Sequence, residues 1–286
     1  MSVEKYRVVK TLHKYRNSLV DHVVSESGQH ITIKAYANEE QHHKRFKYEV
    51  WALTQLLDYK SQAFPQILRS YNKEQPTIYL EFIPGCDLVS FMESNPFVPV
   101  ELLMALIKQI LPALIILQKL NMAHGDIKLD NIILQPFDDM ALSDAVFKLI
   151  DYGSVYGHPE QLVATQPENK WPVGTSGYLS PRVCELYTEG IEQTALLTLE
   201  DYCRNDVFAL GVVLFRLMYH GSEPFELLET PTMYTAHDFT KPRIPKPLYW
   251  DPNNPTLSVK LLDFTHSLLT MPMTPIQAWE LFCSLS

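Results

Sequence analysis

The 286-residue sequence contains little cysteine or glycine and has no apolar segment at its start. Its four cysteines, Cys86, Cys184, Cys203 and Cys283, form no CxxC pair and no metal-ligand spacing. Cysteines this sparse argue against a small disulfide-rich secreted scaffold and favour reduced thiols in an intracellular protein. Because residues 1–15 are polar and basic, we expect no signal peptide.

Basic residues are also scarce relative to acidic ones. The chain has 24 Lys and Arg against 33 Asp and Glu, a net charge of −9 at pH 7. This balance gives no broad electrostatic case for a nucleic-acid partner, and we expect none. One apolar run, residues 102–120, approaches the roughly 20 residues that cross a bilayer. Lys108, Gln109 and Pro112 interrupt it, so we expect a buried or amphipathic helix and no membrane span.

The patterning divides the chain into two regions. Strand signals and one helix, from a cap at Asn38 to about Asp58, dominate the first region. The predicted strands there are Tyr6–Leu12, Leu19–Ser25, His30–Tyr36, Ile67–Asn72 and Thr77–Phe82. The second region has helical patterns at about 87–94, 100–121, 200–219 and 258–285, and short strands at 132–134 and 147–150. The sequence therefore predicts an α+β chain with a small β-rich lobe, residues 1–82, and a larger helical lobe, residues 83–286.

Two short segments of the second region carry the expected chemistry. Phosphoryl transfer needs a metal held against the phosphates, a cation on their oxygens and a carboxylate that aims the acceptor. Residues 124–131, HGDIKLDN, resemble the catalytic loop of the protein-kinase superfamily, and residues 148–153, KLIDYG, resemble its metal-binding Asp-Phe-Gly motif. The resemblance covers nearly the whole chain and implies a two-lobed protein-kinase-like fold with a nucleotide-binding first lobe.

This resemblance implies a role for each position. Asp126 would orient the acceptor hydroxyl and accept its proton, and Lys128 would stabilise the transferring phosphate. Asn131 and Asp151 would bind Mg²⁺, with Mn²⁺ as an alternative ion. Lys34 resembles the strand lysine that binds the α and β phosphates of ATP.

The partner of Lys34 in this family is a glutamate on the following helix. Glu49 lies in the middle of that predicted helix, whereas Glu39 and Glu40 lie at its start, so we choose Glu49.

Residues 78–88 resemble the hinge between the lobes. Leu80 would be the gatekeeper, the backbone of Glu81 and Ile83 would bind adenine, and Asp87 would reach the ribose.

Two further motifs favour a protein substrate over a small molecule. Residues 174–181, GTSGYLSP, resemble the end of a kinase activation segment, which receives the peptide. Residues 206–211, DVFALG, resemble the buried helix whose aspartate anchors the backbone of the catalytic loop.

The chain departs from the family at the loop that covers the phosphates. His13, Tyr15 and Ser18 stand where glycines are expected, although glycine lets backbone amides approach phosphates closely. We hypothesise that Lys14, Arg16 or His13 supplies positive charge instead.

A second departure is Gly125, because most regulated protein kinases have arginine there to pair with a phosphate on the activation segment. We therefore predict activity without phosphorylation of Thr165, Thr175 or Ser176. The HGD and DYG forms together resemble vaccinia-related kinases.

The third departure removes an ion pair of the family. Arg182 replaces the glutamate that usually follows Ser180-Pro181, and residues 271–275 lack its arginine partner.

The leading interpretation is an ATP-dependent Ser/Thr protein kinase that acts on a protein substrate. A pseudokinase scaffold stays open because of the glycine-free loop, and a small-molecule phosphotransferase of the aminoglycoside or choline kinase type stays open because of the HGD form. We expect a cytoplasmic protein, or one in the host cytosol if it is a secreted effector. An activating protein partner and the oligomeric state stay open.

Overall fold

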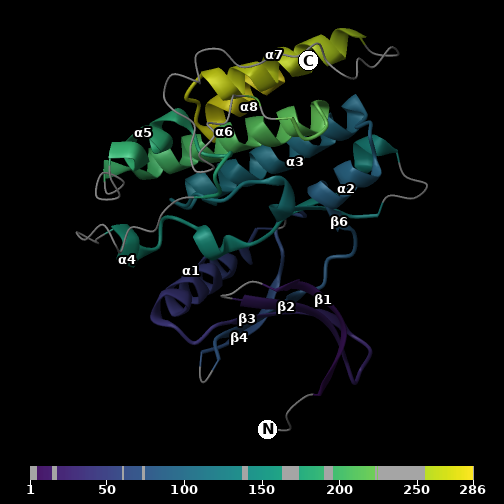
Figure 1. The fold of residues 1–286 in the computed structure, drawn as a ribbon, viewed down its shortest axis with the longest axis vertical. Helices are drawn as coiled ribbons and strands as arrows, with labels where there is room; N and C mark the ends of the chain where they lie inside the picture. Colours follow the sequence, from purple (N-terminus) through teal and green to yellow (C-terminus); the bar gives the residue numbers. More distant parts are fainter. Residues whose placement is uncertain are drawn as a thin grey trace.

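The computed structural model describes residues 5–14, 18–59, 61–72, 75–136, 141–162, 174–189, 196–222, 224 and 255–285. Figure 1 shows an antiparallel sheet with one helix at one end and a larger group of helices at the other. This is the predicted α+β fold, with a small β-rich lobe and a larger, mainly helical lobe.

The small lobe is built on a five-stranded antiparallel sheet with the order β1-β2-β3-β5-β4. Its strands are β1 (Tyr6–Lys14), β2 (Ser18–Ser25), β3 (His30–Tyr36), β4 (Ile67–Tyr71) and β5 (Thr77–Glu81). These elements confirm the predicted strands to within a residue or two at each end, the usual uncertainty of strand limits. Strand β3 lies in the middle, paired along its length with β2 and β5.

One face of β3 turns toward helix α1 (Glu40–Leu56). Successive side chains of a strand point to opposite faces, so Thr32, Lys34 and Tyr36 share this one. All three are buried, with 8%, 8% and 2% of their surfaces exposed. The ring of Phe46 on α1 packs edge-on against Tyr36, with centroids 5.9 Å apart. A buried lysine here departs from the ordinary core pattern and indicates a functional role.

The predicted helix cap at Asn38 is wrong. Glu39 takes the N-cap position with extended backbone and makes no side-chain capping bond. The Asn38 side chain instead pairs with the ring of His43 at 2.8 Å. The helix ends at Leu56 rather than near Asp58, a difference within the usual uncertainty of helix limits.

Two long helices, α3 (Val100–Lys119) and α6 (Leu199–Met218), form the centre of the larger lobe. Near them lie α2 (Leu88–Ser94), α5 (Pro181–Glu189), α7 (Pro255–Thr270) and α8 (Pro275–Cys283). The short helix α4 (Pro159–Leu162) lies beside α1 instead, where Glu160 pairs with Lys47 (Figure 1). Helix α3 contains the apolar run singled out in the sequence. By length and composition it could cross a membrane, yet 61% of its most apolar 18-residue window is buried inside the fold. It therefore resembles a core helix, as expected.

The single helix predicted for residues 258–285 is wrong, because α7 ends at Thr270 and α8 begins at Pro275. Proline has no amide hydrogen and disfavours helical backbone in the residue before it. Thr274 caps α8 by accepting the amide of Gln277, whose side chain bonds back to the Thr274 amide. Both helices bury one apolar face, so the hydrophobic spacing continues across the break and hides it.

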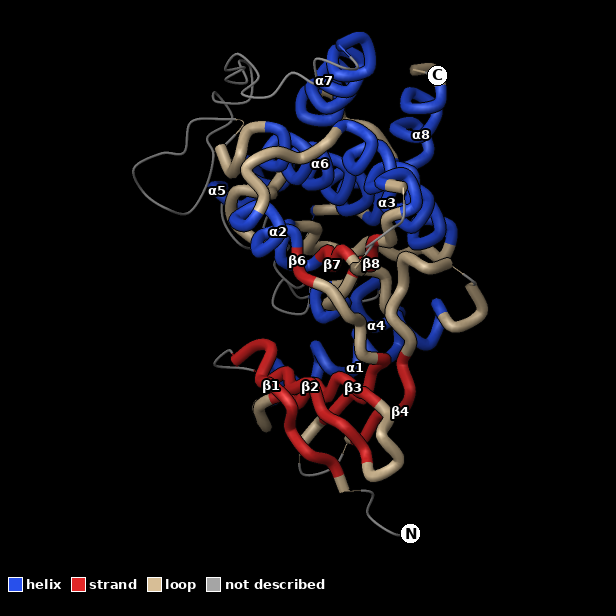
Figure 2. Tube along the Cα trace, turned by 90° about the vertical axis from the view of Figure 1, so that its right-hand side faces the viewer, coloured by secondary structure: helices blue, strands red, loops and turns tan. Residues whose placement is uncertain are grey.

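A second sheet, with the order β6-β7-β8, lies between the large sheet and the helices (Figure 2). Its strands are β6 (Cys86–Asp87), β7 (Ile132–Leu134) and β8 (Phe147–Leu149). Strands β7 and β8 confirm the two short strands predicted for this region. Ile132 pairs with Leu149 across the hairpin, so the residues before β7 and after β8 lie side by side.

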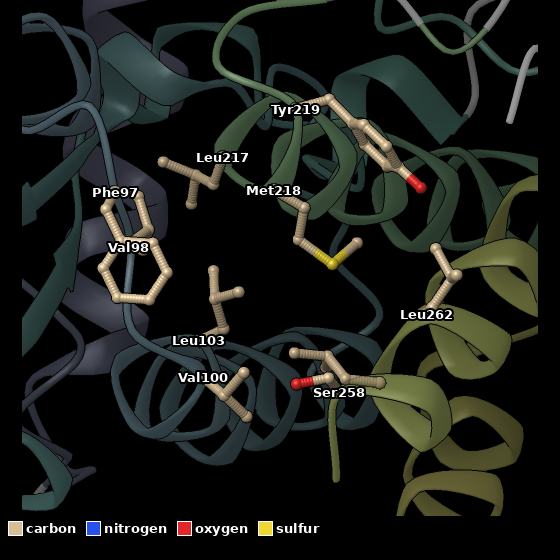
Figure 3. A pocket seen from close by; sticks show the side chains of 10 residues that line it. Phe97, Val98, Val100, Leu103, Leu217, Met218, Tyr219, Ser258 and Leu262 are labelled. Carbon is tan, nitrogen blue, oxygen red and sulfur yellow. The ribbon is translucent and has the colours of Figure 1, made fainter. Parts of the chain in front are cut away.

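An apolar pocket lies elsewhere, among α3, α6 and α7 (Figure 3). Its walls include Val100 and Leu103 of α3, Leu217 and Met218 of α6, and Leu261 and Leu262 of α7. Among the described residues that line it there is no carboxylate, imidazole or amine. The carboxylates and amines expected for catalysis are instead gathered near the β7–β8 hairpin.

Candidate active site

The β7–β8 hairpin brings the predicted catalytic loop next to Asp151. Asn131 ends a 3₁₀ turn just before β7. The amide of Ile150, just after β8, donates to the Asn131 carbonyl at 2.8 Å. Two motifs that are separate in the sequence therefore meet at one end of this hairpin.

Three side chains surround the carboxylate of Asp126. Lys128 Nζ lies 2.9 Å from Oδ2, and the Thr175 hydroxyl donates to Oδ1 at 2.6 Å. Lys128 also donates to the Thr175 hydroxyl at 2.9 Å. Asn131 Nδ2 donates to the Asp126 carbonyl at 2.8 Å and lies 3.3 Å from Oδ2. These contacts hold the carboxylate at one orientation beside an amine and a hydroxyl.

Lys34 lies between two carboxylates that come from different parts of the chain. Its Nζ is 2.7 Å from Glu49 Oε2 and 2.7 Å from Asp151 Oδ1. The predicted pairing of Lys34 with Glu49 is therefore confirmed. Lys34 also connects the small lobe to the motif that follows β8.

Burial and charge act against each other in this cluster. Burial alone would lower the pKa of Lys34, but the charges of Asp151 and Glu49 outweigh it and raise that pKa. Burial raises the pKa of Glu49 to about 7, although Lys34 opposes the rise. Burial also tends to raise the pKa of Asp151, but Lys34 and the Gly153 amide hold it below its usual range. The amine therefore stays charged, while Glu49 is close to neutralisation at neutral pH.

The backbone of Asp151 is strained. It has φ 62° and ψ 76°, in the left-handed region, and its side chain accepts the amide of Gly153 at 3.2 Å. A non-glycine residue in this region costs about 1–3 kcal/mol and persists only where its surroundings hold it. Such strain is concentrated at functional sites, which agrees with the predicted metal-binding role.

Asp206 of α6 anchors the start of the catalytic loop. Its two carboxylate oxygens accept the amides of His124 at 2.6 Å and Gly125 at 2.9 Å. Burial raises the pKa of Asp206 to about 7, and these two backbone donors oppose the rise. The predicted anchoring contact is therefore confirmed.

The presence of glycine at position 125 has a local steric explanation. Its φ is 79°, and a Cβ there would lie 2.4 Å from the carbonyl oxygen of Ser154. Any side chain at position 125 would require this part of the loop to move. The backbone itself therefore selects glycine where related kinases have arginine.

The ring of His124 connects the loop to the DYG motif. Its Nε2 donates to the Ile150 carbonyl at 3.0 Å, and its Nδ1 accepts the Asp126 amide at 3.2 Å. Tyr152 packs edge-on against it, with ring centroids 4.8 Å apart. This ring thus helps to set the position of Asp126 relative to Asp151.

The predicted hinge is tied to β8. The Glu81 carboxylate forms an ion pair with Lys148 of β8 and accepts the Gln66 amide at 3.1 Å. Leu80 pairs with Thr32 of β3 in the sheet register and packs against the core. The Leu80 gatekeeper role and adenine binding by Glu81 and Ile83 stay predictions.

Asp87 has a structural role that the sequence did not predict. It is the N-cap of α2, and its side chain accepts the amide of Ser90 at 2.7 Å. Contact with a ribose would have to coexist with this cap, so that contact also stays a prediction.

Two contact residues were missed as site residues. Thr175 was considered only for phosphorylation, although it lies in the predicted peptide platform, where it bridges Asp126 and Lys128. Tyr36 was not considered, yet its hydroxyl donates to Glu49 Oε2. The alternation of β3 could have revealed it, because Tyr36 is two residues beyond Lys34 and shares its face.

Some predictions concern residues outside the described part of the chain. Tyr15 and Arg16 of the phosphate loop and Thr165 of the activation segment are among them. His13 and Lys14 end β1, paired with Val20 and Leu19 of β2. The idea that Lys14 or Arg16 replaces the glycine amides stays a prediction.

Arg182 is described, and it lies at the surface. It contacts Glu185 of α5 at 3.4 Å, and about half of each side chain is exposed.

A family model for the protein kinase domain matches residues 6–275. The serine/threonine-protein kinase unc-51 of Caenorhabditis elegans is 24% identical over 248 residues, covering 79% of this chain and 26% of that protein. The meiosis-specific serine/threonine-protein kinase mek1 of Schizosaccharomyces pombe is 29% identical over 168 residues, covering 56% of this chain and 35% of that protein. The chain thus spans a quarter to a third of the length of these relatives. It belongs to the protein kinase domain family.

Proposed function

We propose that this chain is an active Ser/Thr protein kinase that transfers the γ-phosphoryl group of ATP to a protein hydroxyl. The observation that carries the proposal is the assembly of both halves of the chemistry at hydrogen-bond distance. Lys34, Glu49 and Asp151 form one connected cluster. Asp126 and Lys128 form a second cluster. A scaffold without catalysis would not need either arrangement.

The oxygen donors fit a magnesium ion, the divalent ion that usually accompanies ATP. Asp151 uses Oδ1 for Lys34 and the Gly153 amide, and the described contacts leave Oδ2 available. Asn131 uses its Nδ2 on Asp126, which turns the amide oxygen away from that carboxylate. Mg²⁺ prefers such hard oxygen ligands and completes its shell with phosphates and water. When bound, the ion would neutralise charge on the phosphates.

Asp126 is the proposed base. Phosphoryl transfer needs mainly positioning and charge stabilisation, so a base acts by aiming the hydroxyl and taking its proton late. The contacts with Lys128 and Thr175 fix the carboxylate in advance. A preset orientation avoids reorganisation during the reaction.

Lys128 would then act on the transferring group. Burial alone would lower its pKa, but the neighbouring Asp126 carboxylate outweighs this and raises it. The amine therefore stays protonated and can stabilise negative charge on the phosphoryl oxygens. Thr175, which connects Lys128 to the peptide platform, would couple substrate binding to this arrangement.

The direct test is incubation of the purified chain with radiolabelled ATP, Mg²⁺ and generic protein substrates. We expect label on serine or threonine with wild-type protein and none with Asp151→Ala. Label that is equal in both proteins would contradict the proposal.

The second candidate is a pseudokinase scaffold, and the glycine-free loop is the observation that favours it. A scaffold of this kind would transfer no label to any substrate and would lose no function on Asp151→Ala. Transfer to aminoglycosides or choline, but not to protein, would instead support the small-molecule phosphotransferase.

A further inference from the structure

Tyr36 lies at the meeting point of β3, α1 and the DYG turn. Its side chain is almost fully buried, and its ring packs edge-on against Phe46 of α1. Lys34 Nζ lies 5.2 Å from the centre of this ring. A Cβ built on Gly153 would lie 3.7 Å from the Tyr36 hydroxyl, so the hydroxyl faces the motif that carries Asp151.

The hydroxyl has a defined partner. It donates to Oε2 of Glu49, the same oxygen that accepts the Lys34 amine. Only 1% of the Glu49 surface is exposed, and burial disfavours its charged form. A buried carboxylate needs hydrogen-bond donors to remain ionised. Lys34 and Tyr36 are its side-chain donors among the described residues, and the backbone amide of Tyr152 is a further donor.

Lys34 alone cannot hold Glu49 securely, because it is shared. Its amine lies 2.7 Å from Asp151 as well as from Glu49. When that amine turns toward the phosphates of a nucleotide, its bond to Glu49 must adjust. The Tyr36 hydroxyl makes no such adjustment, because its ring is fixed between the sheet and Phe46.

We infer that Tyr36 is a positioning residue for the phosphate-binding lysine, and that its hydroxyl holds Glu49 in the orientation that pairs with Lys34. The inference rests on the proposed function, since it takes Lys34 as the group that binds the ATP phosphates. It assigns Tyr36 a contact that connects α1 to the sheet without any activation-segment phosphate.

The test compares Tyr36→Phe with wild type. This change removes only the hydroxyl and keeps the ring that packs on Phe46. The matched control is Tyr71→Phe on β4, which removes a hydroxyl from a tyrosine that is 48% exposed. The readouts are the Kd of Mg·ATP, the KM for ATP, the KM for protein substrate, kcat and the melting temperature.

We expect Tyr36→Phe to raise the Kd and KM for ATP by on the order of 10-fold, the usual effect of losing one hydrogen bond to a charged group. The KM for protein substrate should stay unchanged, as should every constant of Tyr71→Phe. A loss shared equally by both substrates would show a general structural role and overturn the inference.

A double-mutant cycle tests whether the hydroxyl acts through Glu49. In a Glu49→Ala background, adding Tyr36→Phe should leave the ATP constants unchanged, because the partner is gone. A 10-fold effect that persists in this background would overturn the inference.

The outcomes separate this inference from the proposed function. If wild type binds Mg·ATP but transfers no phosphate, the proposed function fails, and the ratio of Kd values still decides the role of Tyr36. If wild type transfers phosphate and Tyr36→Phe has the same ATP constants, only the inference fails. A wild-type protein that binds no nucleotide would overturn both.

Discussion

The two sides of the proposed nucleotide site differ in how firmly contacts hold their residues. On the catalytic-loop side, Asp206 holds two backbone amides, and Asp126 is held by an amine and a hydroxyl. On the opposite side, β1 is exposed along almost its whole length, including Val8 at 55% and Leu12 at 42%. The residues proposed for the chemistry therefore lie where several buried contacts determine each position. Strand β1, which leads into the loop predicted to cover the phosphates, is held by few such contacts along its described residues.

The largest expected effect is a loss of kcat when the catalytic-loop side is changed at Asp126. Asp126→Asn should lower kcat by about 10²–10⁴-fold, the usual contribution of a general base, while the Kd of Mg·ATP changes little. Single-turnover kinetics and ATP titration would measure the two quantities. A wild-type kcat in Asp126→Asn would contradict the assignment of the chemistry to the catalytic-loop side.

Thr175 should come next. Thr175→Val keeps the shape but removes the hydroxyl between Asp126 and Lys128, and we expect kcat to fall by roughly 10–100-fold for loss of two hydrogen bonds to charged groups. Thr175→Ser should restore most of the rate in the same assay. If Thr175→Glu were more active than wild type, Thr175 would be a phosphorylation switch rather than a bridge.

Removal of positive charge from the predicted phosphate loop should have a smaller effect, on the KM for ATP. Lys14→Ala combined with Arg16→Ala should raise the KM for ATP by up to about 10-fold, if these cations replace the glycine amides on the phosphates. Lys5→Ala with Lys10→Ala removes the same charge from the residues just before and within β1 and is the matched control. An unchanged KM in the first variant would refute the replacement of amides by side-chain charge.

The pH dependence should report on Glu49. Its pKa of about 7 means that it gains a proton as pH falls through neutrality, and only the ionised form attracts Lys34. We therefore expect kcat/KM for ATP to fall below about pH 7, by at most tenfold per pH unit for one proton. In Glu49→Gln, kcat/KM for ATP should be lower overall and should not show this fall below pH 7. An identical fall of kcat/KM in both proteins would show that another group titrates.

The smallest effect is expected for removal of phosphate groups from the protein. Complete dephosphorylation should leave the rate unchanged, because Gly125 offers no arginine to pair with a phosphate. Phosphatase treatment followed by mass spectrometry and an activity assay would check this. Restoration of a lost rate by rephosphorylation of Ser176 would contradict it.

Much of the site could be predicted because its residues lie in short motifs. Asp126, Lys128 and Asn131 share one loop, and Asp151 follows β8, which pairs with the strand β7 that leaves this loop. The resemblance implies a glutamate on the helix after Lys34, and the position of Glu49 in the middle of that helix identified it as the partner. The break between α7 and α8 was missed because the periodic apolar pattern was followed past Pro272 and Pro275, the local signals that interrupt a helix.

The sequence by itself determined the family, the α+β order of elements and the residue types of the chemistry, because these depend on local pattern and spacing. Only the tertiary structure decided which side chains share an oxygen. Tyr36 meets Glu49, and Thr175 joins Asp126 to Lys128, through contacts between segments that approach only after packing. The same holds for Gly125, whose lack of a side chain is required by the carbonyl of Ser154. Such contacts depend on where separate segments come together in space, which no local periodicity encodes.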